Sequence, residues 1–169
     1  DRPSAFRYPR GNGIGIELPN LNEKLEIGKG RIIKEGKNVA LINFGARLNE
    51  CLIARENLIK KGINLTLVDA RFVKPLDENL IWQLATTHEA IMTIEEGSIG
   101  GFGSHVVNFL TKKGLMDSNL KFRSLTLPDI FIDQDTPDKM YKVANLDSVS
   151  IEEKVLDLLN SNIVLKKQN

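Results

Sequence analysis

Two arginines near the start of the chain form the segment that is best suited to bind a ligand. Arg7 and Arg10 flank Tyr8 and Pro9, and Gly11 follows directly. Because a proline disfavours helical geometry in the residue before it, the segment is predicted to be a strand end or a rigid loop. Guanidinium groups there can bind a phosphate through paired hydrogen bonds. The alternative is a pair of solvated arginines at a domain edge, since charged side chains are mostly exposed.

A glycine-rich run at 95–105 is the second candidate. It reads Glu-Glu-Gly-Ser-Ile-Gly-Gly-Phe-Gly-Ser-His between a predicted strand and a predicted helix, a setting in which backbone amides bind anions. Val106 stands where the dinucleotide-binding fingerprint needs its third glycine, and Glu95 and Glu96 would repel a phosphate. We therefore expect a tight turn in which one of the two glutamates accepts hydrogen bonds from loop amides.

The remaining polar residues form no catalytic set. His88, His105 and Cys51 lack metal-ligand spacing, and no Gly-x-Ser-x-Gly elbow is present. Cys51 is predicted to fill the core, and Trp82 in the second helix to serve packing and not the stacking of a ligand. The sequence therefore assigns no catalytic, metal-binding or cofactor-binding residue to this chain.

Alternating strands and helices must position these residues. Short apolar runs predict four strands, and a further edge strand could lie at 25–33; the four are at 39–44, 63–68, 90–94 and 122–127. Apolar residues at helical spacing follow each of them. This alternation predicts a three-layer α/β fold, with helices on both faces of a mostly parallel, mixed sheet.

Capping signals mark where helices begin. Asp77 is the predicted N-cap of the second helix, and Thr136 before Pro137 predicts the start of a short helix. Ser150 with Glu153 predicts a capping box ahead of the last helix. The helices between parallel strands are expected to join them by right-handed crossovers.

Composition describes an ordinary globular chain. Its 169 residues suit one domain, or one domain with a piece of a neighbour. The net charge of +1 favours neither nucleic acid nor a membrane surface as a partner. No apolar run approaches the roughly 20 residues that span a bilayer. The chain begins at Asp1, so we expect a part of a longer protein, and its single cysteine fits a reducing compartment.

Five sequence blocks carry a resemblance to a known enzyme family. They follow one another in that family's order over nearly the whole chain, at 1–15, 25–32, 68–77, 93–106 and 127–134. On these blocks the chain resembles 1-deoxy-D-xylulose-5-phosphate synthase, a transketolase-type enzyme that uses thiamine diphosphate. The Arg-Tyr-Pro-Arg-Gly block and the Asp-Ala-Arg-Phe-Val-Lys-Pro-Leu-Asp block favour the synthase. The block at 93–97 is similar across transketolases and pyruvate dehydrogenase β subunits.

The resemblance implies a transferase that joins pyruvate to D-glyceraldehyde 3-phosphate with loss of carbon dioxide. Its product feeds isoprenoid, thiamine and pyridoxal phosphate synthesis, in the bacterial cytoplasm or in a plastid. Thiamine diphosphate and Mg²⁺ would be held by N-terminal domains that this chain lacks. Residues 1–24 would end a pyrimidine-binding domain and form a linker, residues 25–160 would be a transketolase C-terminal domain, and residues 161–169 a frayed tail.

One site role follows from the resemblance. The first arginine of the Arg-Tyr-Pro-Arg-Gly block helps to bind the phosphate of the acceptor aldehyde in such enzymes, which corresponds to Arg7, with Arg10 as a second candidate. The domain itself would serve interdomain and homodimer packing. Two other interpretations stay open. The chain could be the C-terminal domain of another transketolase or of a pyruvate dehydrogenase β-type enzyme, or an independent anion- or nucleotide-binding module at Gly97–Ser104.

Overall fold

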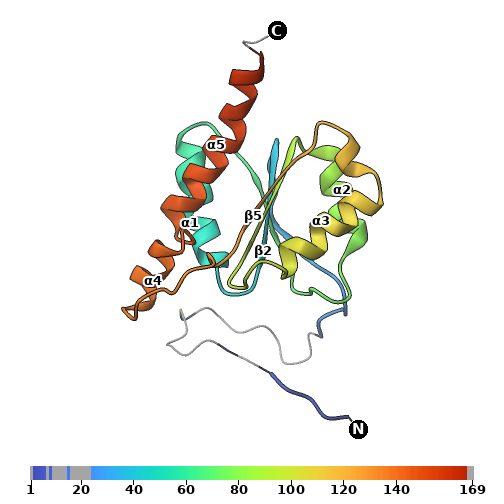
Figure 1. Cartoon of the computed structure of the whole chain (residues 1–169). Coiled ribbons are helices and arrows are strands. Elements are labelled where there is room, and N and C mark those ends of the chain that lie inside the picture. Colours follow the sequence, from blue (N-terminus) through green and yellow to red (C-terminus); the bar gives the residue numbers. More distant parts are fainter. Residues whose placement is uncertain (1, 7, 9–14, 16–23, 167–169) are drawn as a thin grey trace.

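A five-stranded sheet between two layers of helices forms the body of the protein (Figure 1). The computed structural model describes residues 2–6, 8, 15 and 24–166, with side chains as far as residue 160. The strand order is β1-β3-β2-β4-β5. Strands β2 to β5 pair in parallel, and β1 lies antiparallel to β3. The predicted three-layer α/β fold with a mostly parallel, mixed sheet is confirmed.

Strands and helices alternate as the hydrophobic pattern predicts. The strands are β1 (Arg31–Lys34), β2 (Val39–Phe44), β3 (Thr66–Asp69), β4 (Ala90–Glu95) and β5 (Lys121–Leu125). The helices are α1 (Leu48–Lys60), α2 (Glu78–Thr87), α3 (Phe102–Lys112), α4 (Pro137–Val143) and α5 (Ser148–Lys166), with a short 3-10 turn, η1 (Leu115–Asp117), after α3. Some boundaries differ from the predicted ones by a few residues. No helix in the described part of the chain is long and apolar enough to cross a membrane.

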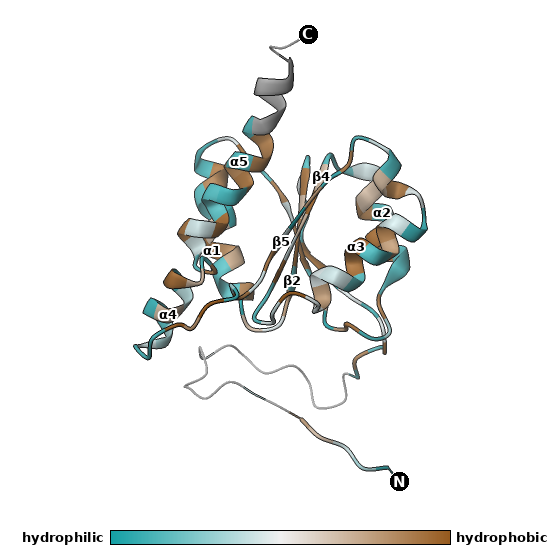
Figure 2. Ribbon diagram, in the orientation of Figure 1, coloured by the Kyte–Doolittle hydropathy of each residue, from teal (hydrophilic) through white to brown (hydrophobic). Residues whose placement is uncertain are grey.

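Each face of the sheet has its own hydrophobic core. Helices α1, α4 and α5 cover one face, and α2 and α3 cover the other (Figure 1). Successive β2 side chains point to opposite faces, so Leu41 packs in the cluster that contains Leu58 of α1, and Ile42 packs with Leu84 of α2. Figure 2 shows hydrophobic residues along the strands between the two helical layers. Strands buried on both faces explain the continuous apolar runs in the sequence.

The last helix begins earlier than predicted. Helix α5 starts at Ser148, and the Asp147 carboxylate accepts a hydrogen bond from the Ser150 amide at 3.0 Å. Asp147 is therefore the capping residue. The capping box predicted from Ser150 and Glu153 is wrong, because Ser150 already lies in the first helical turn. The helix runs to Lys166, into the segment predicted as a tail. The predicted domain boundaries remain predictions.

Two predictions about α2 have different outcomes. The Asp77 side chain accepts a hydrogen bond from the Leu80 amide at 3.1 Å, so the predicted N-cap is confirmed. Trp82 was expected to pack, but 52% of it is exposed. That prediction is wrong, because the helix directs Ile81 and Leu84 toward the sheet and leaves the intervening position facing solvent.

Candidate functional site

The carboxyl ends of the parallel strands meet at one edge of the sheet, where open α/β domains bind their ligands. Three polar groupings lie along this edge. Glu95 lies at the start of α3, Glu96 pairs with Arg47, and Asp69 pairs with two arginines. The three groupings differ in whether their charges are balanced by other groups of the same chain.

The Glu95 side chain is buried against the N-terminus of α3. Its Oε2 and Oε1 atoms accept hydrogen bonds from the amides of Phe102 and Gly103, both at 2.9 Å. Gly101 leaves room for the carboxylate, since a Cβ there would lie 2.2 Å from Oε2. The expectation that one glutamate accepts from loop amides is confirmed. The anion position considered for Gly97–Ser104 is thus filled by a carboxylate of the chain itself.

Glu96 directly follows β4 and lies beside Arg47, just before α1. Arg47 Nε and Glu96 Oε1 are 2.7 Å apart, in an ion pair that lacks hydrogen-bond alignment. The guanidinium lies 3.5 Å from the centre of the Tyr141 ring. Burial, and then the nearby Glu96 carboxylate, raise the pKa of Tyr141.

These three side chains lie where the chain changes winding direction. Neighbouring strands β2 and β4 lead into α1 and α3, which cover opposite faces of the sheet. Ligands of open α/β sheets bind in the crevice at such a switch point. Here Arg47, Glu96 and Tyr141 occupy it with their own charges and ring. The switch point is therefore a structural contact between the sheet and α4.

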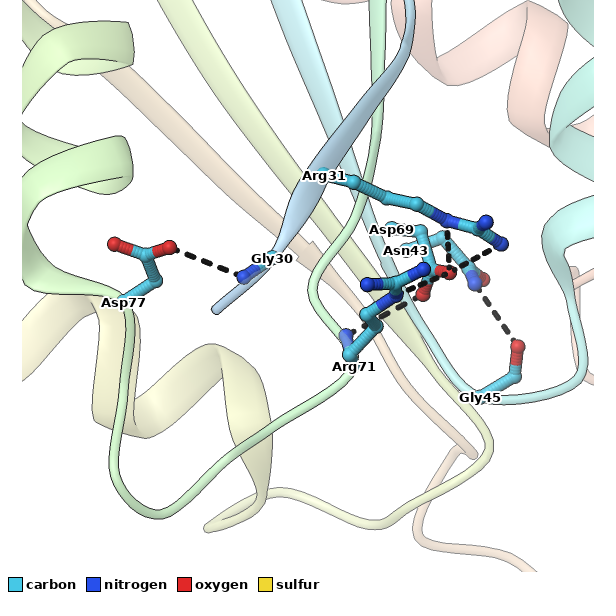
Figure 3. Close-up of polar contacts among 7 residues, drawn as sticks. All are labelled: Gly30, Arg31, Asn43, Gly45, Asp69, Arg71 and Asp77. Carbon is cyan, nitrogen blue, oxygen red and sulfur yellow. Dashed lines mark hydrogen bonds and ion pairs between the residues drawn. The ribbon is translucent and has the colours of Figure 1, made fainter. Parts of the chain in front are cut away.

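The third grouping combines two cations with one carboxylate (Figure 3). Asp69 ends β3, and Arg31 lies opposite it on β1. Arg31 donates from Nε to Asp69 Oδ2 at 3.1 Å, and its Nη2 lies 3.1 Å from the same oxygen. Arg71 Nε lies farther away, at 3.8 Å. Arg31, Asp69 and Arg71, here called the Asp69 cluster, therefore carry one positive charge in excess.

Arg71 has an unusual backbone conformation. Its φ is +56°, in the left-handed region that non-glycine residues rarely adopt. The Asp69 Oδ1 atom supports this turn by accepting a hydrogen bond from the Arg71 amide at 3.3 Å. Within the described residues, no hydrogen bond reaches the Arg71 guanidinium, and 22% of the side chain is exposed. Its fork of N–H groups is available to a ligand, and such strained residues often lie at functional sites.

Asn43 adds an acceptor beside the Asp69 cluster. It pairs in register with Asp69 across β2 and β3, and its Nδ2 donates to the Gly45 carbonyl at 2.9 Å. That bond defines which end of the amide is oxygen. The Oδ1 atom is buried and has no hydrogen-bond partner within the described chain. The edge thus combines cationic donors with a neutral acceptor, a set suited to an anionic ligand that also carries a hydroxyl group.

The arginines predicted to bind phosphate, Arg7 and Arg10, lie outside the described residues, so their role remains a prediction. Tyr8 between them is described, and its ring stacks on Phe6 with centroids 5.9 Å apart. Sequence reasoning missed the Asp69 cluster. Its only signal was the Asp-Ala-Arg run, which was used for the resemblance and not for a site.

The remaining candidate side chains do not join the site. Cys51 is buried in α1, as predicted, and burial, with a smaller contribution from Glu50, raises the pKa of its thiol to about 12. His88 lies at the opposite, amino-terminal edge, with Nε2 2.7 Å from Thr66 Oγ1. No group of three or more His, Cys, Asp or Glu residues in the described part of the chain could hold a metal ion. The expected thiamine diphosphate and Mg²⁺ on other domains remain predictions.

Comparisons with known proteins agree with this fold. Residues 28–151 match the family described as Transketolase, C-terminal domain. A solved structure described as a split gene transketolase, inactive beta4 tetramer, aligns with a TM-score of 0.75 and 28% sequence identity. The alignment covers 85% of this chain and 46% of that chain, so this chain spans less than half of that relative. Because the family match extends over most of the sequence, the chain belongs to the transketolase C-terminal domain family.

Proposed function

We propose that the chain is the C-terminal part of a 1-deoxy-D-xylulose-5-phosphate synthase, which joins pyruvate to D-glyceraldehyde 3-phosphate with loss of carbon dioxide. Membership of the transketolase C-terminal domain family supports a transferase of the thiamine-diphosphate class. The Arg-Tyr-Pro-Arg-Gly and Asp-Ala-Arg-Phe-Val-Lys-Pro-Leu-Asp blocks support the synthase. Another transketolase-type enzyme is the alternative.

The observation that carries a role for this domain is the charge excess of the Asp69 cluster. A phosphate monoester is a dianion that a planar guanidinium binds through paired hydrogen bonds. Arg71 offers such a fork at the carboxyl edge of the sheet, and Asn43 Oδ1 offers an acceptor for a neighbouring hydroxyl. We assign to Arg71 a contact with the phosphate of the acceptor aldehyde, in addition to the contacts expected of Arg7 and Arg10.

The chemistry divides between domains in this proposal. Thiamine diphosphate, bound with Mg²⁺ by domains outside this chain, supplies the decarboxylation and carbon–carbon bond chemistry. The residues of this chain bind and orient the phosphate end of the acceptor, remote from the carbonyl that reacts. Binding energy gained at a remote group can hold the reacting carbonyl in position.

Assembly is the second part of the proposed role. The related split gene transketolase is described as a tetramer of its β chains, which supports contacts between copies of this chain. Phe131 and Ile130 are exposed on the apolar segment before α4 and suit such a contact. Phe131→Ser should reduce self-association in sedimentation velocity. An unchanged distribution of oligomers would contradict this assignment.

A substrate comparison with the complete enzyme tests the proposal. With thiamine diphosphate and Mg²⁺, we expect 1-deoxy-D-xylulose 5-phosphate and carbon dioxide from pyruvate and D-glyceraldehyde 3-phosphate. Turnover of ketose phosphate donors without activity on pyruvate would instead identify another transketolase. The 169-residue chain alone should neither bind the cofactor nor turn over substrate. Appreciable activity of that chain would contradict the division between domains.

Substitutions test the phosphate contacts. In the complete enzyme, Arg71→Gln and Arg7→Ala should each raise the KM for D-glyceraldehyde 3-phosphate by about 10- to 100-fold, the usual effect of losing one charge-assisted contact. The KM for pyruvate and the cofactor affinity should stay nearly unchanged, because neither ligand uses these residues. Lys34→Gln is the control, since it removes an exposed charge from the same strand as Arg31, β1, at the end away from Asp69. An unchanged KM in Arg71→Gln would exclude the phosphate contact in this domain.

A further inference from the structure

Arg31 lies beside Asp69, where the proposed phosphate contact of Arg71 alone does not require a second arginine. It lies on the edge strand β1, where its Cα pairs with that of Asp69 in the antiparallel register. Both of its contacts to Asp69 Oδ2 are 3.1 Å long, whereas the contact from Arg71 Nε is 3.8 Å. Since ionic attraction falls with distance, Arg31 compensates more of the Asp69 charge than Arg71 does.

The start of β1 is anchored so that Arg31 reaches Asp69 (Figure 3). The Gly30 amide donates to Asp77 Oδ2 at 3.0 Å, while the other Asp77 oxygen caps α2 through the Leu80 amide. Gly30 also packs closely against α2, since a Cβ there would lie 2.9 Å from Leu80 Cδ2. One aspartate thus ties the beginning of the edge strand to the beginning of α2. The residue that follows, Arg31, is held in register with Asp69.

The consequence concerns the charge that Arg71 can offer to a ligand. With Arg31 in place, the three side chains carry a net charge of +1. Without it, Asp69 and Arg71 would form a neutral pair, and the carboxylate would compete with an incoming phosphate for the same guanidinium. Arg31 is the most exposed of the three, with 51% of its side chain accessible against 15% for Asp69 and 22% for Arg71. It therefore satisfies the carboxylate from the solvent side.

We propose that Arg31 is a positioning residue of the phosphate site, which neutralises Asp69 and so leaves the Arg71 guanidinium free for an anion. This inference rests on the proposed contact between Arg71 and phosphate. Arg31 itself does not have to touch the substrate. Its effect is transmitted through Asp69, which both arginines contact.

A charge-balance cycle in the complete enzyme tests this inference. Arg31→Gln should raise the KM for D-glyceraldehyde 3-phosphate roughly three- to tenfold, because the uncompensated Asp69 carboxylate then competes with the phosphate for the Arg71 guanidinium, with kcat nearly unchanged. Asp69→Asn should leave this KM unchanged or lower it. The double variant R31Q/D69N should return close to the wild-type KM, because both the cation and the carboxylate that it compensates are gone.

Three further variants separate this role from a structural one. Arg31→Lys keeps the charge and should recover most of the affinity, Lys34→Gln should have no effect, and Arg31→Gln should add nothing in an Arg71→Gln background. The difference between wild type and Arg31→Gln should also shrink at high salt, since exposed charges are screened. Melting temperatures measured in parallel show whether a change in KM merely follows lost stability.

The outcomes distinguish the two proposals. An unchanged KM in Arg71→Gln would overturn the phosphate contact itself. If Arg71→Gln raises the KM but R31Q/D69N does not recover, the compensating role of Arg31 is wrong while the phosphate contact stands. An equal rise in the KM of the Lys34→Gln variant would also overturn the inference, because it would indicate a general effect of surface charge and not an effect of the Asp69 cluster.

Discussion

Two carboxylates at the same edge of the sheet have opposite relations to their surroundings. Glu95 is buried and accepts hydrogen bonds from two backbone amides at the start of α3, so its negative charge is satisfied within the domain. Asp69 is shared by two arginines, so its cluster retains a positive charge. A helix N-terminus that already holds a carboxylate offers nothing to an outside anion. At Asp69 two arginines face one carboxylate, so one cation remains available for an outside anion.

This difference decides between two interpretations of the chain. An independent nucleotide-binding module would need the glycine-rich turn or the switch point. Glu95 fills the first and the Arg47–Glu96 pair fills the second. Of the three groupings compared at this edge, the Asp69 cluster is the one that keeps an excess charge, which fits the proposed contribution of this domain to a larger active site.

The largest expected effect is on stability at Glu95. Glu95→Gln should lower the free energy of unfolding by about 2–4 kcal/mol, because the amide replaces one acceptor oxygen by a donor that faces a backbone N–H. Urea denaturation with an unchanged m-value measures this loss. Glu153→Gln, on the exposed side of α5, is the matched control and should stay within about 0.5 kcal/mol of wild type.

Removal of the Glu95 side chain tests whether its carboxylate occupies an anion site. If the carboxylate fills an anion site, Glu95→Ala should open it, and sulfate should stabilise this variant more than it stabilises the wild type. Equal stabilisation of both proteins would contradict the view that Glu95 replaces an external anion.

Gly101→Ala tests the space around the Glu95 carboxylate. The new Cβ would overlap Oε2, at 2.2 Å, so the buried carboxylate or the turn must shift. We expect a loss of about 1–3 kcal/mol, as for other overpacked interiors. Ser98→Ala on the exposed part of the same turn should be nearly neutral in the same denaturation measurement. A neutral Gly101→Ala would show that the turn tolerates a displaced glutamate.

Asp69→Asn should affect stability far less than Glu95→Gln. Its partners are partly exposed, and such ion pairs contribute only about 0–1 kcal/mol. The same urea titration gives both values on one scale. If Asp69→Asn lowers the free energy of unfolding as much as Glu95→Gln does, the Asp69 cluster is a structural element. The proposed difference between the two carboxylates would then be wrong.

The smallest effect is expected at the amino-terminal edge, far from both carboxylates. Burial lowers the pKa of His88 below its usual 6.5, and Thr66, which accepts from the Gly36 amide, can donate its hydroxyl hydrogen to Nε2 of the neutral ring. The unfolded chain therefore binds this proton at higher pH than the folded chain. Stability should be full above pH 6.5 and decrease as the pH falls through 6.5 toward the lower folded-state pKa.

His88→Gln should flatten that part of the profile of unfolding free energy against pH. Denaturation curves measured at intervals between pH 5 and pH 8 provide the profile. A slope that persists unchanged in the variant would assign the proton uptake to another group.

The layers of the fold were predictable because strands buried on both faces, such as β2 and β4, have continuous apolar sequences that differ from the periodic pattern of the helices. The start of α5 could not be predicted in this way. Asp147 and Ser150 are both good capping residues, and the choice depends on a tertiary contact in which Glu50 of α1 accepts a hydrogen bond from the Ser148 amide at 2.9 Å. Local patterns carry no information about that partner.

The Asp69 cluster was hidden for a related reason. Arg31 and Asp69 lie 38 positions apart, and they meet because β1 joins the sheet antiparallel beside β3. The left-handed turn at Arg71 depends on the same carboxylate, which accepts its amide hydrogen. The Glu95 contact, in contrast, spans only seven positions and follows from strand, turn and helix in sequence, so its structural role could be predicted.

Hydrogen exchange in the complete enzyme distinguishes phosphate binding at the Asp69 cluster from binding at the glycine-rich turn. D-glyceraldehyde 3-phosphate is added without pyruvate, so that the ligand binds without turnover, and amide exchange is followed by mass spectrometry. We expect slower exchange in peptides that cover residues 69–73 and no change in peptides that cover 97–104. Slower exchange at 97–104 with none at 69–73 would contradict the account, because it would place the anion at the position that Glu95 fills.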